Sequence, residues 1–209
     1  MTGPVTGPLI GPAQVAAVVL AAGASRRLGR PKQLLDFRGA TLFDATIGTV
    51  RAAGFGQVVV ALGGAADEIR ARVDLGGADV VLNPDFGDGC ATSIRRALSR
   101  VRDDAAGVVL LLGDQPGVTV ATIEALVSGA AGHAVGVCEY DDGLGHPLWF
   151  DRRTFGTLAR LHGDKAVWKL VDAGEDVATV RVPGDVPLDV DTWEDYRALL
   201  GEAPLEVSE

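Results

Sequence analysis

The sequence predicts a three-layer α/β/α protein built on a mostly parallel β-sheet with an antiparallel edge strand. Two observations lead to this prediction. Short apolar runs rich in β-branched residues recur along the first half of the chain, and helical patterns separate them. Continuous apolar runs are typical of strands buried on both faces. Strands that alternate with helices form right-handed βαβ units, which produce a parallel sheet covered by helices.

The first half of the chain contains four expected strands and three expected helices. The strands are residues 15–20, 57–62, 78–82 and 107–112, and the helices are residues 41–53, 65–73 and 89–101. Thr41 is suited to cap the first helix, because Asp44 follows three residues later. Gly54 stands where a glycine commonly ends a helix.

The second half is less regular. The expected helices are 121–131, 152–161, 165–173 and 192–200, and the expected strands are 133–139, 146–150 and 176–182. The turn Asp141-Asp142-Gly143 separates two of these strands. This loss of regular alternation between strands and helices favours one antiparallel strand at the edge of the sheet.

Length and composition indicate one domain. The chain has 209 residues, of which 47% are hydrophobic, and single cores commonly hold roughly 100–200 residues. We assign residues 15–200 to a single domain. Glycine and proline alternate through residues 1–14, so this segment is expected to be a flexible tail. Residues 201–209 are expected to be frayed.

Charge and cysteine content exclude several classes of protein. Nineteen basic and 28 acidic residues give a net charge of −9, which disfavours binding to nucleic acids or anionic membranes. The most apolar run, residues 15–24, is too short to span a bilayer. Cys90 and Cys138 form neither a disulfide framework nor a CxxC pair. These features favour a cytoplasmic protein without a membrane segment.

The end of the first strand carries an anion-binding pattern. Small residues, 21–24, follow the strand and leave their backbone N–H groups accessible. A dense set of cations comes next: Arg26, Arg27, Arg30 and Lys32. The patterns GxxxxGK[ST] and GxGxxG are both absent, so this is neither a Walker loop nor a dinucleotide fingerprint. The alternative is a glycine turn followed by a solvated basic loop.

Two further strand ends carry carboxylates. Asp114 follows the strand 107–112 almost directly, where a carboxylate requires a positive partner such as Mg²⁺. The alternative is that Asp114 caps the turn through Pro116. Asp189 and Asp191 alternate near the C-terminus and therefore point the same way. Asp191 is also suited to cap the last helix.

The loop 83–93 joins the third strand to a helix. It is rich in glycine and polar residues, and Ser93 and the backbone are suited to contact the edge of a nucleobase. The alternative is an ordinary strand-to-helix connection. Cys90 has no neighbouring histidine that would make it a nucleophile, so it is interpreted as a small filler residue. The three histidines, His133, His146 and His162, lack the spacing of a zinc site.

Six segments together identify a family resemblance. They are LAAGASRRLGRPKQLL, NPDFGDGCATSIRRAL, LLGDQP, GHPLWF, LHGDKA and PLDVDTWEDY, in this order. They resemble the molybdenum cofactor nucleotidyltransferases, in particular the cytidylyltransferase branch, over residues 15–200. The resemblance implies a Rossmann-like nucleotidyltransferase fold. Ala21-Ala22-Gly23 is similar to the cytidylyltransferase form, whereas guanylyl enzymes usually carry a second glycine there.

The resemblance also implies roles for individual residues. The triphosphate would be held by Ala21, Ala22, Gly23 and Lys32, with Arg26 or Arg27 assisting. Ser93 and its loop, which includes Asp85, would approach the base or the ribose. Asp114 would bind Mg²⁺, and Asp191 would be the second metal ligand, with Asp189 as the alternative. Lys32, Arg26 and Asp114 would then be the catalytic groups. Cys90 and the pair Val167-Trp168 depart from the usual family pattern, as does Leu28 in place of a methionine.

The implied reaction is transfer of CMP from CTP to molybdopterin with release of pyrophosphate. It needs cations and a metal around the phosphates but no covalent intermediate, which agrees with the absence of an obvious nucleophile. The alternatives are GTP as donor, or a sugar or lactate phosphate as acceptor. Further alternatives are an NAD(P)H-dependent quinone-type oxidoreductase on the same scaffold and a non-catalytic chaperone. A molybdenum hydroxylase is the expected recipient of the product.

Overall fold

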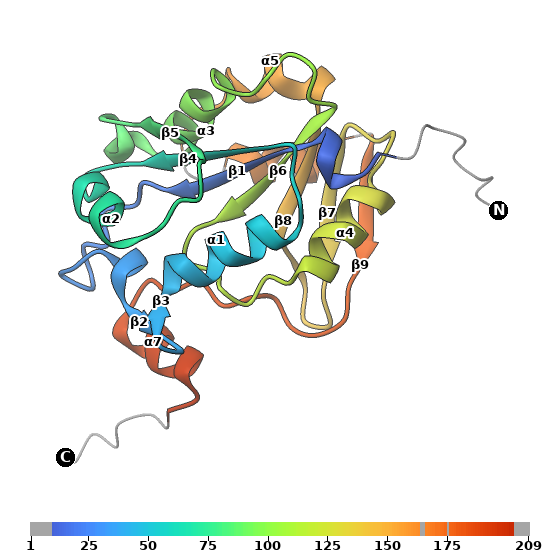
Figure 1. The fold of residues 1–209 in the computed structure, drawn as a ribbon. Coiled ribbons are helices and arrows are strands. Elements are labelled where there is room, and N and C mark those ends of the chain that lie inside the picture. Colours follow the sequence, from blue (N-terminus) through green and yellow to red (C-terminus); the bar gives the residue numbers. More distant parts are fainter. Residues whose placement is uncertain (1–9, 164–165, 175, 203–209) are drawn as a thin grey trace.

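A seven-stranded sheet forms the centre of the molecule (Figure 1). The computed structural model describes residues 10–163, 166–174 and 176–202. Within this part of the chain the strand order is β5-β4-β1-β6-β8-β7-β9. The strands are β1 (Ala16–Ala21), β4 (Gln57–Leu62), β5 (Asp79–Leu82), β6 (Gly107–Leu112), β7 (Val135–Glu139), β8 (Leu144–Asp151) and β9 (Val177–Arg181). A separate two-stranded sheet pairs β2 (Asp36–Phe37) with β3 (Ala40–Thr41).

The helices match the expected positions closely. They are α1 (Leu42–Ala52), α2 (Ala66–Arg72), α3 (Cys90–Leu98), α4 (Val120–Gly129), α5 (Phe155–Leu158), α6 (Ala166–Ala173) and α7 (Trp193–Leu200). Short 3₁₀ turns occur at η1 (Pro12–Gln14), η2 (Lys32–Leu34), η3 (Phe86–Asp88) and η4 (Arg152–Thr154). The predicted helix 152–161 is therefore shorter and is divided between η4 and α5.

Local signals at the helix ends are confirmed. The hydroxyl of Thr41 accepts a hydrogen bond from the backbone N–H of Asp44, which completes a capping box at the start of α1. Gly54 follows α1 with a φ of +71°, a conformation that glycine adopts without steric cost. Thr192 and Asp195 form a second capping box at the start of α7. Thr192, and not Asp191, is thus the residue that caps the last helix.

The sheet is mostly parallel, as expected, and β8 is its antiparallel strand. The sequence predicted this strand at the edge, but β8 lies between β6 and β7 and pairs antiparallel with both. The edge beyond them is β9, which runs parallel to β7. Both hydrogen-bonding edges of β8 are paired, and Leu148, Trp149 and Phe150 are also buried on its two faces. An edge strand would leave one row of backbone groups unpaired.

Two helical layers cover the sheet, so the predicted three-layer architecture is confirmed. One core contains buried residues of α1, α2 and α4, such as Phe43, Ile69 and Leu126, against one face of the sheet. The other contains buried residues of α3, α5 and α6, such as Ile94, Leu158 and Val171, against the opposite face. Alternate residues of β1 belong to the two cores, as expected for a strand buried on both sides.

A third apolar cluster attaches the C-terminal segment to the N-terminal half of the chain. Tyr196 packs against its buried members, which are Leu28, Leu35, Phe37, Leu42 and Val190. The hydroxyl of Tyr196 donates a hydrogen bond to the backbone oxygen of Asp36, at 2.6 Å. Figure 1 shows α7 beside β2 and β3. This cluster brings residues 187–200 next to the segment that follows β1.

The predicted tails overlap structured residues. Pro12–Gln14 form a 3₁₀ turn within the segment expected to be flexible. Proline suits the first position of such a turn because its missing N–H would have no partner there. The backbone oxygen of Pro12 accepts a hydrogen bond from Gly56, which ties the turn to the chain before β4. At the other end, Gly201 caps α7 with a left-handed conformation. Residues 1–9 and 203–209 lie outside the described residues.

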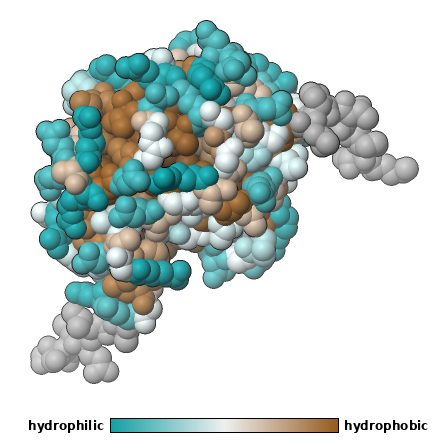
Figure 2. Space-filling model, in the orientation of Figure 1, coloured by the Kyte–Doolittle hydropathy of each residue, from teal (hydrophilic) through white to brown (hydrophobic). Residues whose placement is uncertain are grey.

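The surface is mixed in character. Figure 2 shows hydrophilic side chains around most of the face drawn in Figure 1, and an apolar area on its upper left. The most exposed large hydrophobic side chains of the described residues are Leu82, Leu144, Leu188, Trp193 and Leu200. Among the helices that the structure describes, none combines the length and the hydropathy required to cross a membrane.

Candidate active site

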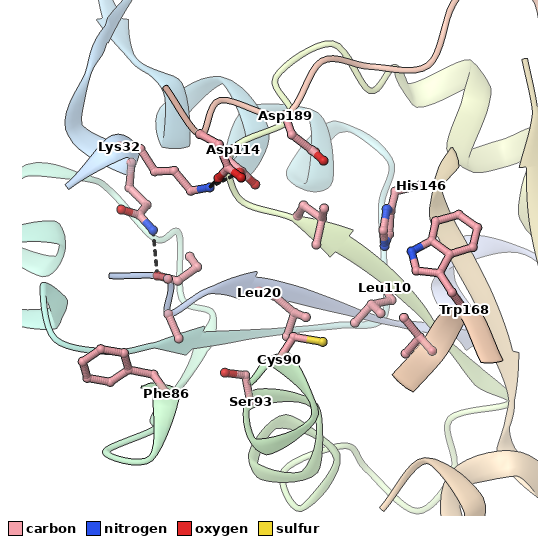
Figure 3. Close-up of a pocket in the computed structure, with 17 residues that line it drawn as sticks. Leu20, Lys32, Phe86, Cys90, Ser93, Leu110, Asp114, His146, Trp168 and Asp189 are labelled. Carbon is pink, nitrogen blue, oxygen red and sulfur yellow. Dashed lines mark hydrogen bonds and ion pairs between the residues drawn. The ribbon is translucent and has the colours of Figure 1, made fainter. Parts of the chain in front are cut away.

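A cavity of about 440 Å³ lies at the carboxyl ends of β1 and β6 (Figure 3). In open α/β sheets this edge is the usual place for a ligand. The cavity has a charged end and an apolar end. Its charged lining residues are Lys32, Asp114, Asp189 and Asp191, and its apolar lining includes Leu20, Leu110, Leu112, Val167 and Trp168.

Lys32 joins two carboxylates at the charged end. Its ammonium group donates hydrogen bonds to Oδ2 of Asp114 and, at 2.7 Å, to Oδ1 of Asp191. Lys32 belongs to η2, Asp114 follows β6, and Asp191 precedes α7, so three distant segments meet here. The side chains of Lys32 and Asp114 are only 13% and 10% exposed. A buried charge of this kind is tolerated only when it is paired.

The pairing determines the charge states. Burial lowers the pKa of Lys32, but Asp114 and Asp191 outweigh that effect and leave the pKa above its ordinary value. The pKa of Asp191 is lowered, chiefly by the hydrogen bond from Lys32. Lys32 is therefore protonated and Asp191 ionised at neutral pH. The site holds a fixed positive charge between negative ones.

The turn after β1 is held against η2 by two hydrogen bonds. Gln33 donates from Nε2 to the backbone oxygen of Ala21 at 3.0 Å, and the backbone N–H of Lys32 donates to Oγ of Ser25 at 3.0 Å. Ala21, Ala22 and Gly23 all line the cavity. A side chain at Gly23 would meet Cε of Lys32 at 3.9 Å. Lys32 therefore lies directly beside the small-residue turn, as the anion-binding pattern requires.

Close packing of two strand ends positions Asp114. A Cβ at Gly113 would lie 2.9 Å from Cβ of Ala21 and 3.0 Å from the ring of Phe43. Only glycine allows β6 to end so near β1, and the next residue then reaches Lys32. Asp114 accepts no backbone hydrogen bond from the residues that the structure describes. Its role as a cap for the turn through Pro116 is thus not observed.

Both C-terminal aspartates line the cavity. Val190 between them is fully buried in the third apolar cluster, so the chain anchors there and presents Asp189 and Asp191 to the cavity. Gln115 donates a hydrogen bond to the backbone oxygen of Pro187 at 2.9 Å, which ties this segment to the loop after β6. In the described part of the chain, no three histidine, cysteine, aspartate or glutamate residues form a complete metal-binding group. A cation bound here would need further ligands from a substrate, in addition to the protein carboxylates.

Asp189 should make stability depend on pH. Partial burial of its carboxyl, and then the charge of Asp114, raise the pKa of Asp189 from 3.8 to about 6. A raised carboxyl pKa stabilises the fold at low pH, and this contribution is lost as the pH rises through 6. In metal-free buffer, Asp189→Asn should gain thermal stability relative to the wild type as the pH increases from 4 to 7. Thermal unfolding measures this, with Asp185→Asn as the control; parallel pH profiles would contradict the burial of the Asp189 carboxyl and its proximity to Asp114.

The other predicted site residues are placed unequally. Arg27 pairs with Asp191 at 3.1 Å but is 67% exposed. Arg26 lines a neighbouring hollow that shares Gly23 and Phe86 with the cavity. Ser93 lines the cavity, and its hydroxyl accepts a hydrogen bond from Nδ2 of Asn83 at 2.8 Å.

Asp85 is not brought to the cavity, which corrects the expectation for this residue. Its carboxylate pairs with Arg96 at 3.1 Å. Asp85 precedes η3, and this short turn presents Phe86 to the cavity instead. Arg96 lies on the exposed side of α3, so the pair belongs to the outer surface. Of the predicted loop 83–93, Phe86, Cys90 and Ser93 line the cavity.

Gln33 and His146 have no functional role predicted from the sequence. Gln33 is buried, and its Oε1 lacks a hydrogen-bond partner in the described part of the molecule. In the sequence, its position directly after Lys32 was the feature that could have indicated a place in the site. His146 is buried beside Trp168, with ring centroids 5.4 Å apart and an interplanar angle of 85°. The GHPLWF segment signalled it. Asp164 and Lys165 of the LHGDKA segment lie outside the described residues.

Comparisons with known proteins match a family model and several relatives. The family described as the MobA-like NTP transferase domain matches residues 17–180. Nicotine blue oxidoreductase of Paenarthrobacter nicotinovorans is 38% identical over 119 residues, which cover 54% of this chain and 55% of that protein. The chain thus spans only about half of that curated relative.

Solved structures are similar over nearly the whole chain. The structure of Rv0371c from Mycobacterium tuberculosis is 53% identical, with a TM-score of 0.86, and the match covers 90% of this chain and 98% of that one. A structure of Rv0371c in complex with manganese is 51% identical, with a TM-score of 0.82, over 91% and 100% of the two chains. A nucleotidyl transferase from Methanothermobacter thermautotroptrophicus has the same fold, at 24% identity and a TM-score of 0.76, over 88% and 95% of the chains.

Proposed function

Because the chain belongs to the MobA-like NTP transferase domain family, we propose that it is a nucleotidyltransferase that transfers CMP from CTP to molybdopterin. One observation supports the chemistry most directly. Lys32 lies between Asp114 and Asp191, beside the small-residue turn after β1. A buried ammonium next to accessible backbone is suited to bind a triphosphate. The form Ala21-Ala22-Gly23 supports CTP as the donor.

In the proposed reaction, a phosphate oxygen of the acceptor attacks the α-phosphorus of CTP. A new phosphorus–oxygen bond forms, the bond to the bridging oxygen breaks, and pyrophosphate leaves. The acceptor phosphate is already deprotonated at neutral pH, so the protein needs no general base. Its task is to hold two anions together and stabilise the charge that develops. Lys32 contributes to this task from within the cavity, and Arg26 and Arg27 from its rim.

The charged end suits a divalent cation. Asp114 and Asp191 already share one positive charge, that of Lys32. Mg²⁺ is commonly bound by one or two carboxylates together with substrate phosphates. We therefore assign Asp114 and Asp191 as the ligands, with Asp189 as the alternative to Asp191. The bound ion would neutralise phosphate charge and act as a Lewis acid. The manganese complex of Rv0371c supports the use of a divalent cation.

The similarity to nicotine blue oxidoreductase favours a second candidate. On this reading the chain would be an NAD(P)H-dependent quinone-type oxidoreductase, with a planar substrate in the apolar end of the cavity. The absence of a GxGxxG fingerprint argues against a dinucleotide site of the usual kind.

Pyrophosphate release separates the two candidates. The purified protein is incubated with CTP, GTP, ATP or UTP and Mg²⁺ or Mn²⁺, with and without molybdopterin, and with glucose 1-phosphate as an alternative acceptor. We expect release only with molybdopterin and a divalent cation, and at least about tenfold faster with CTP than with GTP. Chelation of the metal should stop it. Absence of release from every nucleotide would refute the transferase assignment, and oxidation of NAD(P)H by a quinone would favour the oxidoreductase.

A further inference from the structure

The proposed transfer leaves the apolar end of the cavity without a role. Figure 3 shows His146 and Trp168 together at the end of the cavity opposite Phe86, with Leu110 beside them. His146 comes from β8 and Trp168 from α6. Leu20 and Leu112 add further apolar surface. The charged lining residues of the described chain gather instead around Lys32.

Among the residues that the structure describes, the side chain of His146 is buried and has no hydrogen-bond partner. The residue is only 8% exposed, and it lines the cavity. Within the described residues its ring makes no hydrogen bond. The ring packs edge-to-face against the ring of Trp168. Its backbone oxygen accepts a hydrogen bond from the hydroxyl of Tyr140. Buried polar groups nearly always have partners, so an unpartnered imidazole facing a cavity indicates a ligand.

We propose that this apolar end binds an uncharged, planar heteroaromatic group, and that the imidazole of His146 hydrogen-bonds to this group and positions it against Trp168. The proposal rests on the proposed function and deepens it. The phosphate of the acceptor would lie toward Lys32, and its heteroaromatic part would lie in the apolar end. His146 is then a specificity residue for the acceptor.

The chemistry of the lining favours this class of ligand. Two perpendicular rings and several leucines provide flat apolar surface, which suits a planar ring. Burial lowers the pKa of His146 to about 4, so the imidazole is neutral at physiological pH. A neutral imidazole donates one hydrogen bond and accepts another, as ring nitrogens and carbonyl groups of heteroaromatic rings require. It cannot form an ion pair with a phosphate. A sugar would bring several hydroxyl groups to a surface that offers one polar partner.

Binding of pterin, without nucleotide or metal, tests the proposal. Isothermal titration calorimetry gives its Kd for the wild-type protein and for the variants His146→Phe and His146→Gln. We expect His146→Phe to bind pterin about tenfold more weakly, because it keeps a ring but loses the hydrogen bond. His146→Gln should restore much of the affinity, since an amide both donates and accepts. His133→Phe and His133→Gln are matched controls, because His133 pairs with Asp176 and does not line the cavity.

Equal affinity of wild type and His146→Phe, or no binding to the wild type, would overturn the proposal. So would binding of the uncharged sugar methyl glucoside that depends on His146. If His146→Phe does not fold, the hydrogen bond is tested on the wild-type protein by changing the ligand instead. Wild-type protein should bind quinazolin-4-one about tenfold more tightly than naphthalene, and equal binding would again overturn it. These tests need no turnover, so a failure of the transferase assignment would appear separately, in the pyrophosphate assay.

Discussion

Replacing Asp114 by asparagine should lower the rate of pyrophosphate release by on the order of a thousandfold. The substitution keeps the size of the side chain but removes its negative charge at the carboxyl end of β6. A bound metal that bridges phosphates contributes several kcal/mol to transition-state stabilisation, and each tenfold in rate corresponds to about 1.4 kcal/mol. Because Lys32 retains Asp191 as a partner, the fold should survive the change.

The rate with CTP and molybdopterin, measured against metal concentration, provides the test. Asp74→Asn is the matched control, since Asp74 pairs with Arg51 and its side chain is 79% exposed. The control should retain wild-type activity. A rate for Asp114→Asn within tenfold of the wild type, at saturating metal, would show that Asp114 is not the metal ligand.

Lys32→Met should reduce pyrophosphate release by about 10²–10³-fold. A single preorganised donor to a developing negative charge contributes about 2.7–4 kcal/mol to catalysis, and Lys32 is nearly enclosed at the charged end of the cavity. The substitution retains much of the aliphatic stem that passes Gly23. Lys32→Arg should recover only part of the activity, because a planar guanidinium does not replace a compact ammonium.

Lys32→Met also tests the ion-pair geometry. Without the ammonium, Asp114 is left nearly buried next to Asp191 with no counter-charge, and breaking a buried pair costs about 3–5 kcal/mol. The metal-free variant should therefore unfold at a lower temperature, and added Mn²⁺ should raise its unfolding temperature more than that of the wild type. Arg100→Met, in the exposed turn that follows α3, is the control for loss of a surface charge. An unchanged unfolding temperature together with an unchanged rate would contradict the arrangement of Lys32, Asp114 and Asp191.

Local sequence patterns predicted the first half of the fold closely. The expected strand 57–62 is β4 exactly as observed, and the signals at Thr41 and Gly54 mark the two ends of α1. These features depend on interactions between residues a few positions apart, such as a capping box. Continuous burial of a strand is likewise visible in its own composition.

The second half was predicted less completely. Its strands were recognised, but their order depends on which apolar surfaces meet. β8 carries the buried pair Trp149 and Phe150, and it lies between β6 and β7. Nothing in the local pattern distinguishes an interior antiparallel strand from an edge strand. In the first half, the short sheet of β2 and β3 was not predicted; it packs against α1 and α7, and two-residue strands have no periodicity to detect.

The candidate site divides in the same way. Lys32, Asp114 and the small-residue turn were visible as chemically unusual residues at strand ends, because a carboxylate or a cluster of cations there needs a reason. Asp85 had an equally plausible position in the sequence. In the structure, however, its carboxylate pairs with Arg96 of α3 on the surface. Gln33 and His146 carried no charge pattern, and their importance comes only from burial without a full set of partners.

By itself, the sequence determined the type and approximate extent of most elements, the layered architecture, and the residues able to carry charge at the strand ends, because these follow from local periodicity, capping and composition. The tertiary structure alone decided that Lys32 meets two carboxylates from segments 82 and 159 residues away, that β8 lies inside the sheet, and that His146 faces a cavity with no hydrogen-bond partner for its ring in the described part of the chain. Such facts depend on the packing of distant apolar surfaces, above all the cluster around Val190, and no local pattern encodes which surfaces meet.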